Sequence, residues 1–159
     1  MSRILGIDYG EKRIGLALTD ASNSMASPLK AVPNDESLVK NLQDIIKEYN
    51  VEKIIIGIPV NLKGEHGYEA GIVLRFVENI IEPFGIPFLK IDERFTSRIS
   101  ADLLSGNRRY NSVKKKRNLA DAKRIRKSGN IDKISAAVIL NDYLALEEIK
   151  KMSNGFEEK

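Results

Sequence analysis

The sequence predicts an α/β fold in which a mixed sheet has helices on both faces. Two apolar runs at residues 4–7 and 14–18 flank a short turn at residues 9–13, which predicts an antiparallel hairpin. A later run, "VEKIIIGIPV", is continuously apolar and rich in β-branched residues, as expected of a strand buried on both faces. Helical patterns separate the later strands, and such crossovers make the strands parallel.

The elements can be assigned in order from the hairpin onward. A third strand is predicted within residues 25–32 and a helix within residues 34–50, with Asn34 or Asp35 as its N-cap and acidic residues in its first turn. The helix would present one apolar face to the core, formed by Leu38, Leu42, Ile45, Ile46 and Tyr49.

The second half of the chain alternates strands and helices. After the central strand comes a glycine-bearing loop, "NLKGEHG", and a helix over about residues 68–81. The inward-facing residues of this helix are predicted to be Ile72, Phe76, Val77 and Ile80. A further strand lies within "GIPFLKIDERFTS", residues 97–104 are predicted to be helical, and the last helix runs from residue 131 to about 152.

Length and composition indicate a single soluble domain. The chain has 159 residues, and we expect one domain over residues 1–150 and a flexible tail over residues 151–159. It contains no cysteine, which excludes disulfides, thiolate zinc sites and cysteine nucleophiles. No secretory leader opens it and no apolar run approaches the ~20 residues of a membrane span. We therefore expect a cytoplasmic protein.

Charge is distributed unevenly along the chain. Between residues 108 and 127 there are ten basic residues and a single acid, Asp121, while the rest of the chain has 16 basic and 21 acidic residues. The basic residues are Arg108, Arg109, Lys114, Lys115, Lys116, Arg117, Lys123, Arg124, Arg126 and Lys127. Such a block is either a solvated surface or a binding site for a polyanion.

Three acidic positions lie at the ends of predicted elements. Asp8 closes the first strand, Glu93 follows Asp92 at the end of the last strand, and Asp132 opens the final helix. If the first and last strands are near each other, these acids could converge, because crevices form at the carboxyl edge of a sheet.

Clustered carboxylates repel one another unless a cation compensates their charge. Magnesium or manganese suits oxygen ligands, and two such ions ~4 Å apart can activate water and stabilise the leaving oxygen in phosphodiester cleavage. Each acid also has a structural alternative. Asp8 could accept hydrogen bonds within a turn, Asp92 and Glu93 could pair with Arg94, and Asp132 could favour a helix N-terminus.

Four motifs in order resemble the YqgF family, also called the RuvX or Holliday junction resolvase-like family. They are "GIDYGEKRIGLALTD", "IIIGIPVNLKGEHG", "IDERFTS" and "IDKISAAVILNDYL", and they extend over residues 3–146. The resemblance implies a ribonuclease H-like fold with a five-stranded mixed sheet. It also implies a nuclease associated with 5′-end processing of pre-16S ribosomal RNA, with Holliday junction resolution on branched DNA as the alternative.

The resemblance also implies the site residues. Asp8, Glu93 and Asp132 match the family's acids and would bind two Mg²⁺ or Mn²⁺ ions, with Asp92 adjacent to the site. Positions of the neighbouring motifs that also match are Arg94, Thr96, Asn61 and Gly64. The segment over residues 107–131 is longer than is usual in the family, and its basic residues are predicted to contact phosphates.

Two residues in predicted loops have both a functional and a structural interpretation. Tyr110 could stack on an unpaired base or pack locally, and His66 could lie near the site or be a solvated loop residue. The expected partner is nucleic acid, with structured RNA favoured and branched DNA as the alternative, and we expect a monomer or weak homodimer. Other functions consistent with the motifs are a non-catalytic RNA-binding module and half of an ATP-binding protein; no P-loop motif occurs.

Overall fold

The computed structural model describes residues 1–60, 65–92 and 131–154, within which side chains of residues 131–134 and 152–154 are not described. Its elements are β1 (Arg3–Asp8), β2 (Arg13–Thr19), β3 (Ala26–Pro33), α1 (Leu38–Glu48), β4 (Val51–Ile58), α2 (Tyr68–Phe76), β5 (Phe88–Asp92) and α5 (Ile131–Asn154). The helix predicted at residues 97–104 lies outside the described residues. None of the helices in these ranges combines the length and apolar character required to cross a bilayer.

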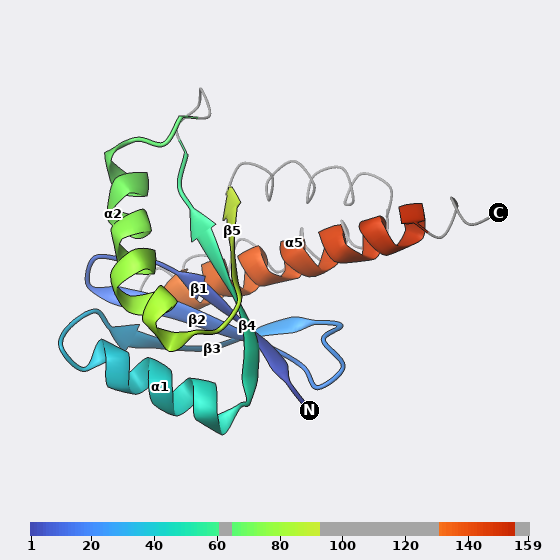
Figure 1. Cartoon of the computed structure of the whole chain (residues 1–159), viewed down its shortest axis with the longest axis horizontal. Helices are drawn as coiled ribbons and strands as arrows, with labels where there is room; N and C mark the ends of the chain where they lie inside the picture. Colours follow the sequence, from blue (N-terminus) through green and yellow to red (C-terminus); the bar gives the residue numbers. More distant parts are fainter. Residues whose placement is uncertain (61–64, 93–130, 155–159) are drawn as a thin grey trace, which may run out of the picture.

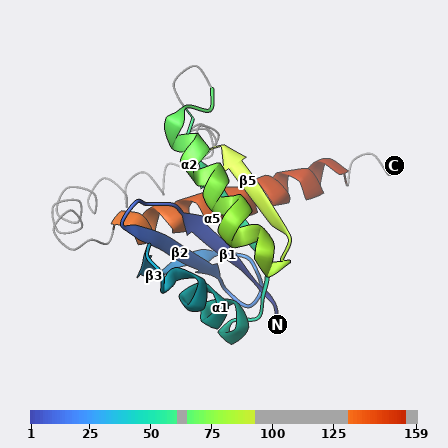
Figure 2. The same cartoon turned by 60° about the vertical axis from the view of Figure 1, so that its left-hand side comes forward.

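The described strands form one five-stranded sheet in the order β3-β2-β1-β4-β5. β1 pairs with β2 and β2 with β3 in antiparallel fashion, while β1, β4 and β5 run parallel. Figure 1 and Figure 2 show α5 crossing one face of the sheet and α1 and α2 covering the other. This arrangement confirms the predicted α/β fold, a five-stranded mixed sheet with helices on both faces.

Strand alternation divides the core into two clusters. Leu5 and Ile7 of β1 pack in the larger cluster with residues of α1 and α2. Ile4 packs in the smaller cluster with the α5 residues Ala136 and Leu140. Because successive side chains of a strand point to opposite faces, the even-numbered residues of β1, including Asp8, lie on the α5 side.

The hairpin turn and the first helix depend on specific local contacts. A side chain at Gly10 would place its Cβ 2.3 Å from the carbonyl oxygen of Arg13, so the turn requires glycine there. α1 begins at Leu38, later than predicted, and its N-cap is Ser37 rather than Asn34 or Asp35. Asp35 instead accepts a hydrogen bond from the Ser37 backbone N–H at 2.9 Å, within the turn before the helix. The acids predicted for the first helical turn therefore lie before it.

The second helix region is less regular than predicted. α2 ends at Phe76 and continues as a single wide π-helical turn over Val77–Ile81, followed by a 3₁₀ turn over Glu82–Phe84. Of the residues predicted to face the core, Phe76 and Val77 are buried and Ile72 and Ile80 are half-buried, while Val73 and Ile81 are also buried. α5 continues to Asn154, so the start of the predicted tail at residue 151 is helical.

Candidate active site

The carboxyl edge of the parallel strands collects acidic positions from distant parts of the chain. β1 ends at Asp8 and β5 ends at Asp92, with β4 between them. Ile7 is paired with Ile56 and Asp92 with Ile58, so Asp8 and Asp92 are offset by one residue along the sheet. Two inter-strand spacings separate them by roughly 10 Å.

The first turns of α5 lie against the same end of β1. A Cβ at Gly6 would lie 2.9 Å from Leu140 Cβ and 3.0 Å from the Ala136 carbonyl oxygen, so only glycine permits this close crossing. Asp8 lies two residues beyond Gly6 on the same face of the strand. Asp132 lies one turn before Ala136 in α5. The crossing at Gly6 therefore places the first turn of α5, which contains Asp132, near the end of β1.

Polar contacts fix α5 on the sheet at two further points. The side-chain amide of Asn141 donates to the Ala26 carbonyl oxygen at 3.0 Å, and its oxygen accepts from the Ala26 N–H at 2.8 Å. Lys53 Nζ in β4 lies 3.0 Å from the hydroxyl oxygen of Tyr143, and this hydrogen bond raises the pKa of Lys53. These contacts fix the helix along its length and so fix its first turn relative to Asp8.

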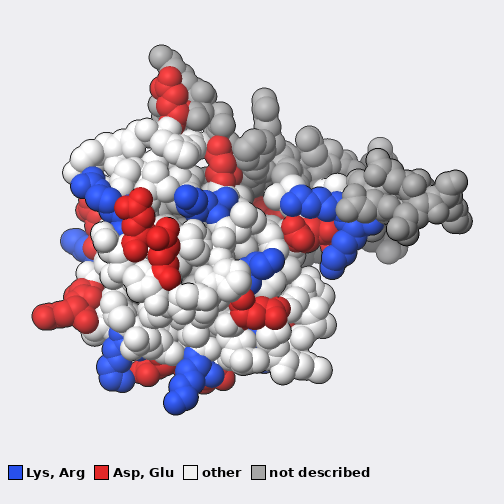
Figure 3. Space-filling model, in the orientation of Figure 1, with Lys and Arg blue, Asp and Glu red and all other residues white. Residues whose placement is uncertain are grey.

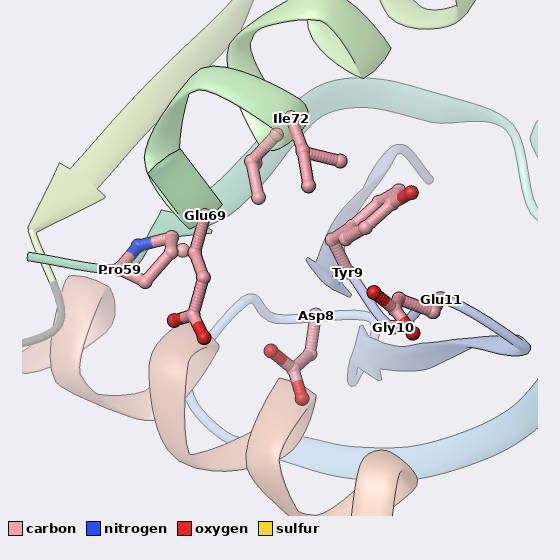
Figure 4. Close-up of a pocket in the computed structure, with 9 residues that line it drawn as sticks. Asp8, Tyr9, Gly10, Glu11, Pro59, Glu69 and Ile72 are labelled. Carbon is pink, nitrogen blue, oxygen red and sulfur yellow. The ribbon is translucent and has the colours of Figure 1, made fainter. Parts of the chain in front are cut away.

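A cavity of about 350 Å³ opens at the end of β1 and is lined by three carboxylates, Asp8, Glu11 and Glu69. Tyr9 and Ile72 line its other side. In Figure 4, the side chains of Asp8 and Glu69 lie close to each other and both point toward the ribbon of α5. Carboxylate oxygens are the ligands that Mg²⁺ and Mn²⁺ prefer, so the donor chemistry of this cavity fits a divalent cation.

Sequence reasoning missed Glu69. It is the second residue of α2, and the loop before that helix follows the carboxyl end of β4. An acidic residue in the first turn of a helix is common for structural reasons, because it interacts favourably with the helix dipole. The sequence did contain one signal for Glu69. A helix that begins at the sheet edge where Asp8 lies brings the side chains of its first turn to that edge.

The structure describes only part of the predicted site. Asp8 lines the acidic cavity and Asp92 ends β5, while Asp132 is placed on the first turn of α5. His66 is exposed. Glu93, Arg94, Thr96, Asn61, Gly64 and all ten basic residues of the block over 108–127 lie outside the described residues. Within the described part of the chain, no three acidic or histidine side chains group closely enough to hold a metal by themselves.

Comparisons with known proteins identify similar chains over nearly the whole length. A family model described as RuvX, Holliday junction resolvase, matches residues 2–146. A Sulfurihydrogenibium sp. (strain YO3AOP1) protein named "Putative pre-16S rRNA nuclease" is 40% identical over 146 residues, covering 91% of this chain and 90% of that protein. A protein of the same name from Thermoanaerobacter pseudethanolicus is 35% identical over 150 residues, covering 93% of this chain and 99% of that protein.

Among solved structures, T. thermophilus RuvC in complex with Holliday junction substrate is similar to this chain with a TM-score of 0.44 and 15% sequence identity. That similarity covers 62% of this chain and 69% of the RuvC chain.

Proposed function

This chain belongs to the RuvX family, and we propose that it is a nuclease that hydrolyses phosphodiester bonds during processing of the 5′ end of pre-16S ribosomal RNA. The family membership rests on the match over residues 2–146 and on relatives that are 35–40% identical. Those relatives are named for a nuclease acting on pre-16S rRNA. The observation that supports the reaction in this chain is the position of Asp8, at the end of β1 in a cavity that it shares with Glu69.

We assign Asp8, Glu93 and Asp132 as the carboxylates that hold two divalent cations. Asp8 is on the α5 side of the sheet, and the crossing at Gly6 brings the first turn of α5 near it. Glu93 directly follows the last residue of β5, a strand whose carboxyl end is at the same edge. With this assignment, one edge of the sheet would receive acidic ligands from the beginning, the middle and the end of the sequence.

Strand alternation favours Glu93 over Asp92 as a ligand. Ile91 packs in the cluster on the α5 side of the sheet. Asp92 is therefore directed to the opposite face, away from the side on which Asp8 lies. We therefore keep Glu93, the next residue in the sequence, as the proposed ligand.

When bound, two divalent cations would supply activation of a water molecule and stabilisation of the leaving oxygen. Asp8 would hold its carboxylate at a fixed position, because it belongs to a strand that is hydrogen-bonded on both sides. Glu69 adds a further negative charge at the rim of the same cavity. Tyr9 and Ile72 line the cavity on the side of α2.

We propose that the basic residues between 108 and 127 bind the phosphates of the substrate. Basic and acidic side chains alternate over the described surface in Figure 3, so the described part of that face has no large basic region. The charge that a polyanion requires is concentrated in the sequence block instead. Phosphate contacts of this kind position a nucleic acid without reading its sequence.

The test of this function is to offer the purified protein a structured RNA containing the 5′ region of the pre-16S transcript, duplex DNA and a four-way DNA junction, each with Mn²⁺, Mg²⁺ or chelator. We expect cleavage of the RNA that requires a cation. Cleavage of the junction alone would assign the activity to branched DNA. Binding of RNA that is unchanged in chelator, without cleavage under any condition, would identify a binding module and contradict the proposal.

The proposed phosphate contacts are tested by replacing residues 114–117 with alanine. Neutralising four contacts should reduce the slope of log K against log salt concentration by about 3. The matched control removes four exposed lysines from the described surface and should leave the slope unchanged: Lys30, Lys40, Lys47 and Lys90. Equal slopes for the block variant and the wild type would show that the block does not contact phosphate.

A further inference from the structure

A second cavity of about 450 Å³ adjoins the acidic one along α2. Tyr9 and Ile72 line both cavities, so the two cavities adjoin at these side chains. The acidic cavity contains three carboxylates, whereas the residues that line the second one include none. Its polar lining consists of Asn34, Arg75 and Asn79, with the rings of Tyr9 and Tyr68.

We propose that this second cavity, the α2 groove, binds an unpaired nucleotide of the substrate strand next to the bond that is cleaved. The inference rests on the proposed nuclease function, because it takes the acidic cavity as the position of the scissile phosphate. The proposal names single-stranded nucleic acid as the ligand of the groove. It also implies that the substrate strand leaves the acidic cavity along α2.

Tyr68 provides the surface for base stacking. It is the first residue of α2 and is 81% exposed, so its ring is accessible to a ligand. An aromatic ring can stack on any base, because every base has a π-face, so this contact does not require a particular sequence. A base held within a duplex is already stacked on both sides, and the groove therefore suits an unpaired nucleotide.

Tyr9 and Asn34 form a rigid side of the groove. The Tyr9 ring packs against the buried Phe76 ring, with centroids 5.2 Å apart and planes tilted by 54°. The Asn34 side chain donates a hydrogen bond to the Gly10 carbonyl oxygen at 2.9 Å, and its backbone N–H donates to Lys12 O at 3.0 Å. With its amide fixed in this way, the Asn34 carboxamide oxygen can accept a hydrogen bond from a base or a sugar hydroxyl.

Arg75 provides the positive charge. Its side chain is exposed, and its Nε donates to the Gly71 carbonyl oxygen of the preceding turn at 3.4 Å. That contact leaves the two terminal guanidinium nitrogens for a ligand, and their planar geometry suits a phosphate group. The volume of the groove, about 450 Å³, lies in the ~300–1,000 Å³ range of ligand pockets and accommodates a base with its sugar.

The test measures binding of a short fluorescent single-stranded RNA in chelator, where cleavage does not occur, and then cleavage with cation. We expect Tyr68→Ala to weaken binding by about tenfold, as for the loss of one stacked base. Tyr68→Phe retains the ring and should restore binding to within a few-fold. Arg75→Ala should weaken binding and lower its salt dependence. Lys47→Ala, which removes an exposed charge from α1, is the matched control and should change neither.

Cleavage assays separate this inference from the function on which it rests. A substrate with an unpaired extension next to the cleaved bond should have a lower KM than a truncated one, and Tyr68→Ala should remove the difference without lowering kcat. Cleavage by Tyr68→Ala and Arg75→Ala with unchanged KM and binding would overturn the α2 groove and leave the nuclease function standing. Tyr68-dependent binding by a wild-type protein that cleaves nothing would overturn the function alone.

Discussion

Two aspartates at opposite ends of the sheet follow similar strands but have different surroundings. Asp8 ends β1, and Asp20 directly follows β2, which is antiparallel to β1. Asp20 accepts hydrogen bonds from the Ser24 N–H and hydroxyl, each at 2.7 Å, from the Ser22 hydroxyl at 2.9 Å and from the Met25 N–H at 3.2 Å. Asp8 lines a cavity together with Glu11 and Glu69.

The difference lies in the groups that surround each carboxylate. Four donors stabilise the charged form of Asp20, chiefly Ser24, and hold its pKa well below the usual value. Asp20 is bonded as a turn aspartate can be, by donors on residues that follow it in the sequence. At Asp8 the neighbouring carboxylates Glu11 and Glu69 add negative charge, which a bound cation would compensate. Substitutions at one of these two aspartates, with the other left intact, test this contrast.

The largest effect is expected at Asp8. Asp8→Asn should reduce cleavage by about 10³-fold or more, because a carboxylate ligand supports several kcal/mol of transition-state stabilisation through the cation. Its thermal unfolding should stay close to wild type. Asp20→Asn is the matched control: it should lower the melting temperature and leave cleavage within a few-fold. Loss of cleavage in Asp20→Asn alone would place the reaction at the other edge of the sheet.

The next effect concerns the close crossing that positions α5. Gly6→Ala would bring a methyl group to 2.9 Å from Leu140 Cβ, so α5 must move away from the strand. Overpacking of this kind costs ~1–3 kcal/mol. We also expect a higher cation concentration for half-maximal cleavage, because the first turn of α5 moves relative to Asp8. The free energy of unfolding and the cation concentration for half-maximal cleavage are both measured well below the melting temperature.

Gly71→Ala is the control for the same substitution in open space. Gly71 is inside α2, and beyond its own helix no atom of the described residues lies within 4 Å of a Cβ built there. Replacing an interior helical glycine by alanine should stabilise the protein by roughly 0.5–1 kcal/mol and leave the cation requirement unchanged. If Gly6→Ala behaves like Gly71→Ala, the crossing at Gly6 does not position the site.

Sequence reasoning predicted the elements well because their signals are local. The runs that form β1, β2 and β4 are apolar over most of their length, and the buried positions of α1 follow the helical period. The start of α1 and the π-helical turn after Phe76 were not predicted, because they depend on hydrogen bonds between specific backbone groups. The sequence motifs predicted Asp8 as a site residue and placed Asp132 at the start of the last helix.

Glu69 could not be predicted in the same way, because its proximity to Asp8 depends on how α2 packs beside β1. The two residues come together only in the folded structure, where they line the same cavity. This limitation is general for contacts between helices and strands that are distant in sequence, where each residue taken alone has an ordinary structural explanation. The next prediction tests whether the contact matters.

A smaller effect is expected at Glu69. Glu69→Gln removes a negative charge from the cavity that Asp8 lines, and should raise the cation concentration for half-maximal cleavage by about tenfold, as for other residues that support metal ligands. The rate at saturating cation should change only a few-fold. Glu78→Gln changes an exposed glutamate in the π-helical turn and should have no effect on either quantity. An unchanged cation requirement in Glu69→Gln would exclude it from the site.

The smallest effect is expected at Asp20 in acid. Its pKa in the folded protein is depressed, so its contribution to stability is fully present above the unfolded value of ~3.9 and is lost as pH falls toward the folded pKa. The melting temperature of the wild type should therefore fall between about pH 5 and 3, and that of Asp20→Asn should fall less over the same range. The two curves should approach each other at the acidic end. Parallel curves would mean that the donors from Ser22, Ser24 and Met25 to Asp20 contribute nothing to stability.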